Sequence, residues 1–151
     1  MAHRPDVLEL LADDHAEAER LVAAYEATRD PERRAALAEQ LLAGLERHAL
    51  AEGHTLHPVV RRLLPDGEQR VAAARQRWEA AAVTVRELRA AEPGSPAVEH
   101  RMSVLLDQVR EHAASQEGEV FAPLRERLSS RELRELGAAA SCWLLGGSGG
   151  E

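Results

Sequence analysis

Helix-breaking residues divide this 151-residue chain into four long segments of similar length and one short one. The breaks are Asp30-Pro31, Pro65-Asp66-Gly67 and Pro93-Gly94-Ser95-Pro96, which combine residues that begin helices with residues that end them. Between the breaks, apolar residues recur at alternating three- and four-residue steps, the spacing of one helix face. The sequence therefore predicts helices over about residues 6–28, 30–64, 66–91 and 97–128, and a short one over 129–140. Three of these starts carry capping pairs, namely Asp6 with Glu9, Asp66 with Gln69 and Ser129 with Glu132.

The composition favours the same fold. The chain contains no Ile, Asn or Lys, so all 19 basic residues are Arg, and only 3% of its residues are aromatic. Sheets are enriched in β-branched and aromatic residues, whereas the abundant Ala and Leu favour helices. Short connections make consecutive helices antiparallel. We expect an all-α fold over residues 1–145, an up-down-up-down four-helix bundle with a short C-terminal fifth helix, followed by a flexible Gly-rich tail at 146–151.

Charge and hydropathy exclude several classes of partner. The net charge of -7 provides no broad basic surface for a nucleic acid or for an anionic membrane. No stretch approaches the ~20 apolar residues that span a bilayer, and the segment from Met1 to Asp6 lacks the apolar run of a secretory signal. We therefore expect a soluble, cytoplasmic protein that binds neither nucleic acid nor membrane. The sequence leaves the oligomeric state open.

Polar residues interrupt the apolar seams of three predicted helices. The core-facing positions include His15 on the first helix, His48 and Glu52 on the second, and His112 on the fourth. The corresponding mid-helix residue of the third helix is Trp78. Residue counts from the connecting loops place these positions at the same level to within about one helical turn. We expect the five residues to form one layer in the middle of the bundle.

Two segments of the chain repeat one pattern. Residues 52–58 and residues 117–123 each contain a glutamate, then a glycine, and a proline six residues after the glutamate. A glycine inside a helix costs about 1 kcal/mol relative to Ala, so Gly53 and Gly118 indicate either a close backbone approach or a bend. The step from histidine to glutamate is four residues on the second helix and five on the fourth. We expect a local widening of the fourth helix near Glu117, of a kind found at functional sites.

A layer of three imidazoles and two carboxylates is costly to bury alone, because the charged forms lose their hydration. A metal ion would offset that cost. The single cysteine, Cys142, and the absence of a CxxC pair leave only histidines and carboxylates as ligands. Such ligands suit iron or manganese, and zinc is also compatible. Taken one at a time, each histidine is more often a hydrogen-bonded core residue or one that reaches the surface, whereas together with Glu52 and Glu117 the three favour a metal site.

Three motifs occur in a fixed order: Asp13-Asp14-His15, then His48-x3-Glu52 followed by Leu56-His57-Pro58, then His112-x4-Glu117 followed by Phe121 and Pro123. In order, spacing and helix placement they resemble the hemerythrin-like (HHE cation-binding) domain family over about residues 6–128. The resemblance implies a non-haem diiron site in which Glu52 and Glu117 are bridging carboxylates. The ligands it implies are His15, His48, Glu52, His112 and Glu117. Members of this family bind dioxygen or nitric oxide, handle peroxide, or sense iron.

The third predicted helix departs from the family pattern. The family usually has one or two histidines there, whereas this chain has Trp78 and no histidine between His57 and His100. An iron that lacks one imidazole has an additional open position, which favours substrate or peroxide chemistry over reversible oxygen carriage. Trp78 is then either ordinary core packing or the wall of a substrate pocket.

Three hypotheses follow for the function. The first is a hemerythrin-like iron protein, diiron by preference, that reacts with dioxygen, peroxide or nitric oxide. The second is a non-haem iron oxidase or oxygenase that admits a small organic substrate at the position vacated on the third helix. The third is a metal-free helical interaction bundle.

Several polar residues near the motifs have simpler interpretations. His54, His57 and His100 are expected at the surface, with contact to the metal ligands as the alternative for His57. Asp13 and Asp14 are expected to be surface charges, with the orientation of an imidazole as the alternative for one of them.

Overall fold

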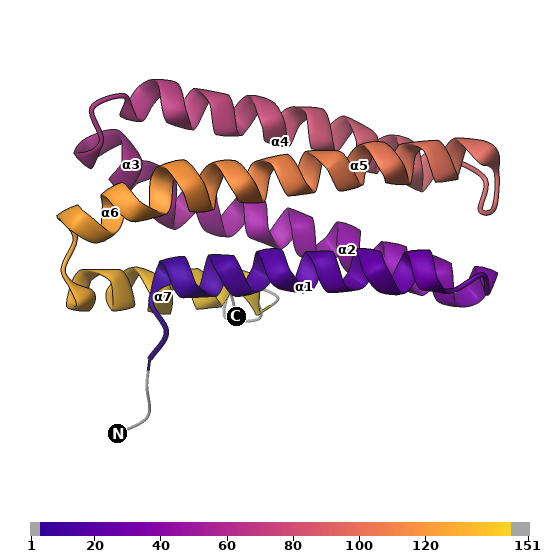
Figure 1. Cartoon of the computed structure of the whole chain (residues 1–151), viewed down its shortest axis with the longest axis horizontal. Coiled ribbons are helices and arrows are strands. Elements are labelled where there is room, and N and C mark those ends of the chain that lie inside the picture. The colour runs from indigo at the N-terminus through magenta and orange to yellow at the C-terminus, as the bar shows by residue number, and fades with distance from the viewer. Residues whose placement is uncertain (1–3, 146–151) are drawn as a thin grey trace.

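The computed structural model describes residues 4–145, and within them all regular structure is helical. The long helices are α1 (Val7–Ala27), α2 (Pro31–Ala51), α4 (Gly67–Ala90) and α5 (Pro96–Ser115) (Figure 1). Two of these helices continue past a five-residue π-helical turn, and each continuous stretch is called a rod below, as are α1 and α4. The helix α2 continues through η1 (Glu52–Leu56) into α3 (His57–Leu63), and α5 continues through η2 (Gln116–Val120) into α6 (Phe121–Arg127). The predicted all-α bundle is thus confirmed.

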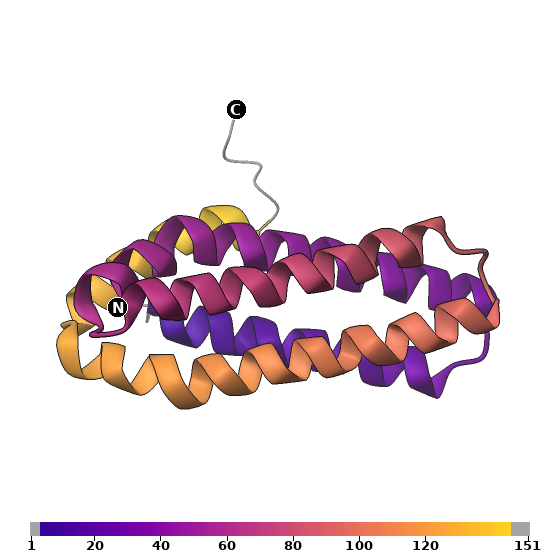
Figure 2. The ribbon, with the colours of Figure 1, turned by 90° about the horizontal axis from the view of Figure 1, so that it is seen from above.

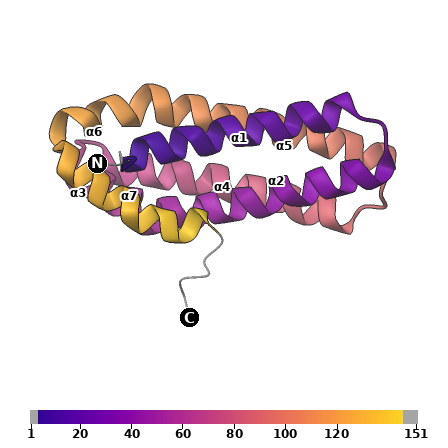
Figure 3. The ribbon, with the colours of Figure 1, turned by 90° about the horizontal axis from the view of Figure 1, so that it is seen from below.

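The fifth helix, α7 (Ser130–Leu144), is also present and packs against α1, α2 and η1 (Figure 3). Gly137 allows α7 to approach the start of α1, because a Cβ at this position would lie only 2.5 Å from the carbonyl oxygen of Pro5. On the opposite side of the bundle, α4 and α5 lie alongside each other (Figure 2). The Gly-rich tail predicted at 146–151 lies outside the described residues. In the part of the chain described, no helix is both long and apolar enough to cross a membrane.

Local capping explains where two of the helices begin. The Asp6 carboxylate accepts a 2.8 Å hydrogen bond from the Glu9 backbone N–H, and the Glu9 side chain accepts one of 3.2 Å from the Asp6 N–H. Ser129 Oγ accepts a 3.1 Å bond from the N–H of Glu132. The predicted cap at Asp66 is wrong. Its φ of -104° and ψ of 30° lie outside the extended region that a capping residue adopts, and its side chain makes no capping bond.

Two apolar clusters fill the interior, one on each side of a polar layer. The first lies where α3, α6 and α7 meet and includes Leu8, Leu56 and Leu124. The second lies toward the α1–α2 and α4–α5 connections and includes Val85 and Leu105. Each buried side chain of this size stabilises the fold by about 1.5–3 kcal/mol, so the two clusters hold the backbone of the layer between them in place. The polar layer contains His15, His48, Glu52 and His112.

Candidate metal centre

Four of the five predicted metal ligands meet in the polar layer. One donor atom each from His15, His48, Glu52 and His112 lies within 4.8 Å of the others. The ring centroids of His15 and His48 are 4.8 Å apart, and those of His48 and His112 are 5.6 Å apart. Glu52 Oε1 accepts a 2.7 Å hydrogen bond from His112 Nε2 and also contacts His48 Nε2. Side chains from α1, α2, η1 and α5 thus converge on one point.

Carboxylates behind two of the imidazoles fix their orientation. His48 Nδ1 donates to Asp14 Oδ2 at 2.6 Å, and His15 Nδ1 donates to Glu117 Oε2 at 2.8 Å. A bond of this kind holds the proton on Nδ1 and leaves Nε2 free to bind a metal. The Nε2 atoms of His15 and His48 are both buried; that of His15 has no hydrogen-bond partner among the described residues, and that of His48 lies against Glu52 Oε1. The expectation that Asp14 is only a surface charge is therefore wrong, and the alternative is what the structure shows.

Glu117 lies beside the four converging donors. Its side chain is 46% exposed, and its carboxylate is bonded to the outer nitrogen of His15. The position four residues after His112 is Gln116, which is 3% exposed and faces the interior. The predicted widening of the fourth helix is present as η2, but it begins at Gln116. The segment from His112 to Glu117 therefore keeps nearly regular α-helical geometry, in which a five-residue step turns about 140° away.

A second π turn, η1, was not predicted. The N–H of His57 donates to Glu52 O in η1, and the N–H of Phe121 donates to Gln116 O in η2, five residues apart instead of four. The repeated glycines accompany these turns but do not permit a close approach. A Cβ added at Gly53 or Gly118 would meet no atom of the described residues within 4 Å. Of the two explanations for these glycines, the close approach is wrong and local distortion of the helix is what the structure contains.

The turn η1 brings His57 beside Glu52, the contact that the sequence left as the alternative to a surface position. In a regular α-helix a residue five positions after Glu52 lies about 140° around the helix. The wider turn rotates it back, so that His57 Nε2 lies 3.6 Å from Glu52 Oε2 and the side chain is buried. The prediction that His57 is a surface residue is wrong. The only signal for its position was the repeated Gly and Pro pattern, whereas His54 and His100 are exposed as expected.

The layer contains strongly interacting charges. Burial opposes protonation of His48, but the adjacent carboxylates of Glu52 and Asp14 outweigh it and raise the pKa of His48 to about 10. Burial likewise disfavours the Glu52 carboxylate, but the neighbouring imidazoles, His48 foremost, hold its pKa well below the usual range. Burial and the charge of His48 lower the pKa of His15. Without a metal ion, the protonated His48 pairs with the Glu52 carboxylate; a metal ion bound at His48 Nε2 would take the place of its proton.

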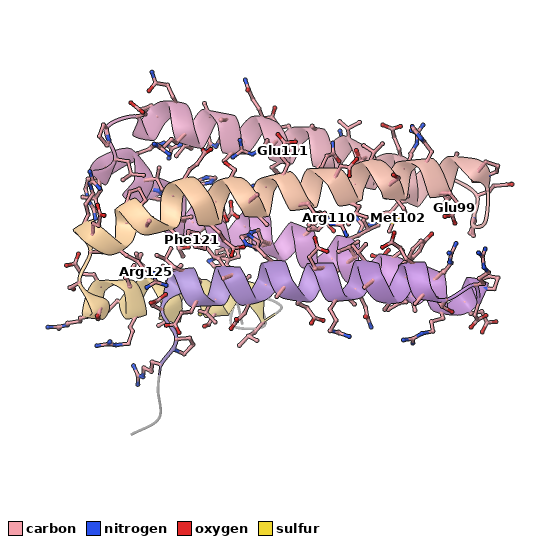
Figure 4. The ribbon with its side chains drawn as sticks, in the orientation of Figure 1. Glu99, Met102, Arg110, Glu111, Phe121 and Arg125 are labelled. Carbon is pink, nitrogen blue, oxygen red and sulfur yellow. The ribbon has the colours of Figure 1, made fainter. Side chains whose placement is uncertain are left out.

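A cavity of about 370 Å³ reaches this layer. Its wall includes Ala74 and Trp78 of α4, together with His48, Glu52 and His57. Trp78 is half-buried and also packs against the second apolar cluster, so both interpretations of this residue agree with its position. The ring of Phe121, labelled in Figure 4, lies nearly parallel to that of His15, with centroids 6.3 Å apart. An aromatic ring thus lies beside His15, and the cavity reaches the layer from α4.

Comparison with known proteins gives one family. The family model described as the hemerythrin HHE cation-binding domain matches residues 6–124. Neither the curated proteins nor the solved structures include a significant match. The matched segment contains α1 to α5, both π turns and all five predicted ligands. The chain therefore belongs to the hemerythrin HHE cation-binding domain family.

Proposed function

We propose that this protein binds iron in its polar layer, two ions by preference, and that it reacts with dioxygen, peroxide or nitric oxide. The single observation that carries the proposal is the convergence of one donor atom each from His15, His48, Glu52 and His112 within 4.8 Å, where the buried Nε2 of His15 has no hydrogen-bond partner among the described residues. Carboxylates hold the imidazoles of His15 and His48 with their Nε2 atoms inward. The membership in a cation-binding family supports the same conclusion.

Each residue of the layer has a distinct task in this proposal. His15, His48, Glu52 and His112 would hold the iron, and Glu117 joins them as the fifth predicted ligand or keeps its bond to His15. Asp14 retains the Nδ1 proton of His48. Iron supplies open coordination positions at which a small molecule binds and exchanges electrons. The apolar clusters on both sides of the layer limit its contact with water.

The cavity favours a second candidate function. Its volume of about 370 Å³ is in the range of pockets that take small organic ligands, and Trp78 forms part of its wall. A non-haem iron oxidase or oxygenase would use this space for its substrate. Turnover of an added organic substrate, lost on Trp78→Ala with iron content unchanged, would separate this function from reaction with dioxygen, peroxide or nitric oxide alone.

The test is anaerobic loading with ferrous iron, removal of unbound metal, metal analysis, and an absorption spectrum before and after exposure to air. We expect about two irons per chain and a visible absorption that changes on exposure to air. His48→Ala should lose both metal and absorption, whereas His100→Ala, at an exposed position, should retain them. Parallel loading with manganese and zinc determines the preferred metal. Failure to retain any metal would leave the metal-free bundle as the function.

A further inference from the structure

His57 is a buried polar side chain that the predicted ligand set does not use. It is 8% exposed, and neither of its ring nitrogens has a hydrogen-bond partner among the described residues. Buried imidazoles normally satisfy at least one nitrogen, because leaving both without a partner forfeits their hydration. The described residues offer His57 the Glu52 carboxylate, 3.6 Å from Nε2 and beyond hydrogen-bond distance, so this ring can accept a further ligand.

The two oxygens of Glu52 face different histidines. Oε1 lies against the Nε2 atoms of His48 and His112, and Oε2 lies 3.6 Å from His57 Nε2. Two ligands that each bind one ion at about 2.1 Å are about 3.0 Å apart at a right angle and about 3.4 Å apart at the tetrahedral angle. The separation of His57 Nε2 from Glu52 Oε2 is close to that of two ligands on one ion. Glu52 can therefore bind one ion through each oxygen.

The surroundings of His57 leave room for this second ion. His57, Gly53 and Ala74 all line the cavity that reaches the layer, and Trp78 lies one turn beyond Ala74 on α4. A glycine and an alanine contribute no donor and little volume. The sequence of α4 contains no histidine, so this helix contributes no imidazole to the cavity. An imidazole comes instead from the second long helix, where η1 turns His57 toward the same space.

We propose that His57 supplies the imidazole of a second metal position, which shares Glu52 with the first and opens to the cavity. The inference rests on the proposed function in one respect, namely that His15, His48 and His112 hold a metal ion at the first position. In this proposal η1 has a functional role, because a regular α-helix would turn His57 away from Glu52. The test must also distinguish this role from one in which His57 binds no metal and only positions Glu52.

Metal stoichiometry of the full chain tests the inference, with Co²⁺ as the probe and metal analysis after equilibrium dialysis. We expect about two ions per chain for the wild-type protein and about one for His57→Leu and for His57→Gln. The glutamine can still donate a hydrogen bond to Glu52, so a purely positioning role would be kept by His57→Gln and the second ion retained. His54→Leu is the matched control, since His54 lies three residues before His57, within η1, but is exposed. Circular dichroism of each variant verifies the fold.

A thiolate at the same position gives a spectroscopic readout. In a Cys142→Ser background, which removes the exposed cysteine, His57→Cys should give a near-ultraviolet thiolate-to-cobalt band. Two ions bound to His57→Leu, or two ions bound to His57→Cys without this band, would overturn the inference. A wild-type chain that binds one ion would overturn it and leave the first position standing. A wild-type chain that binds none would overturn the proposed function as well.

Discussion

Which nitrogen of a histidine faces the interior is decided by the group behind it. Asp14 and Glu117 each bond an outer Nδ1, and the inner Nε2 atoms of His48 and His15 face the layer as a result. The sequence indicated the inward histidines through their place in the apolar seams. It could not show which carboxylate stands behind which ring, because Asp14 and His48 are 34 residues apart and meet only through packing of α1 on α2.

Loss of the carboxylate behind His48 should weaken metal binding without removing a ligand. We expect Asp14→Ala to lower the affinity for metal by about 10–100-fold, because the imidazole loses the bond that fixes its tautomer and orientation. Asp14→Asn should lower it less, since the amide oxygen still accepts the Nδ1 proton. Competition with a chromophoric chelator measures the affinity. Asp13→Ala is the control at a neighbouring exposed position, and equal affinities for all three variants would contradict the assignment.

Asp6 should make a pH-dependent contribution to stability. Burial raises the pKa of its carboxyl, but the Glu9 N–H and the Arg125 guanidinium 3.0 Å away outweigh burial and lower it (Figure 4). A carboxylate with a lowered pKa in the folded state contributes stability above its unfolded pKa of about 3.9 and loses it as the pH falls through the folded value. Asp6→Ala should cost about 0.5–2 kcal/mol at pH 7 through loss of the helix cap.

Urea unfolding of the metal-free protein at pH 7 and at acidic pH measures this contribution. Asp6→Asn preserves a capping side chain but not the charge. Its stability deficit relative to the wild-type protein should therefore shrink as the pH falls through the folded pKa. A deficit that is independent of pH would show that the charge of Asp6 contributes nothing.

At the scale of helices, the first and last residues of each helix were largely predictable, whereas only one of the two π turns was predicted. Pro and Gly mark the ends of the rods, and the predicted bounds agree with the observed ones to within a few residues. The widening in the fourth helix could be inferred because its His-to-Glu step is five residues. The step from His48 to Glu52 is four, which fits a regular helix, and the extra residue of η1 comes after Glu52. His57 was misplaced for that reason.

Substitution by alanine should change the stability of the protein in opposite directions at Gly53 and at Gly137. At Gly53 an added Cβ meets no described atom within 4 Å, so Gly53→Ala should raise the free energy of unfolding by about 0.5–1 kcal/mol. At Gly137 the same Cβ would lie 2.5 Å from Pro5 O, so Gly137→Ala should lower the free energy of unfolding by about 1–3 kcal/mol. Chemical unfolding measures both values. Destabilisation by Gly53→Ala would show that η1 requires a glycine for its own backbone conformation.

At the scale of the whole molecule, the candidate metal centre lies between the two apolar clusters. All three imidazoles and Glu52 belong to rods that extend into both clusters. The level of this layer could be predicted by counting residues from the loops. A pocket beside Trp78 was one of two interpretations of the sequence, but its extent could not be predicted, because small residues such as Gly53 and Ala74 from different helices line it together. The close approach of α7 to the start of α1 at Gly137 likewise appears only in the folded chain.

Metal should stabilise the entire bundle, because an ion held by three rods binds only the folded state. At a free concentration of about 100 times the dissociation constant, binding adds about 2.7 kcal/mol. For a chain of this size that corresponds to a rise of about 5–10 °C in Tm. Differential scanning calorimetry with and without metal measures the shift. His48→Ala should show no metal-dependent shift, and an equal shift in this variant would place the stabilising ion elsewhere.

The two tryptophans of the chain belong to different helices, Trp78 to α4 and Trp143 to α7. Trp78 lines the cavity on α4, and Trp143 of α7 is stacked on His54 of η1 with ring centroids 4.1 Å apart. The protein therefore contains two fluorophores with separate surroundings. With Trp143 replaced by Phe, the remaining indole emission reports filling of the cavity and quenching by a bound paramagnetic ion. With Trp78 replaced by Phe, it reports whether α7 stays docked on η1, so the two events can be followed independently by light.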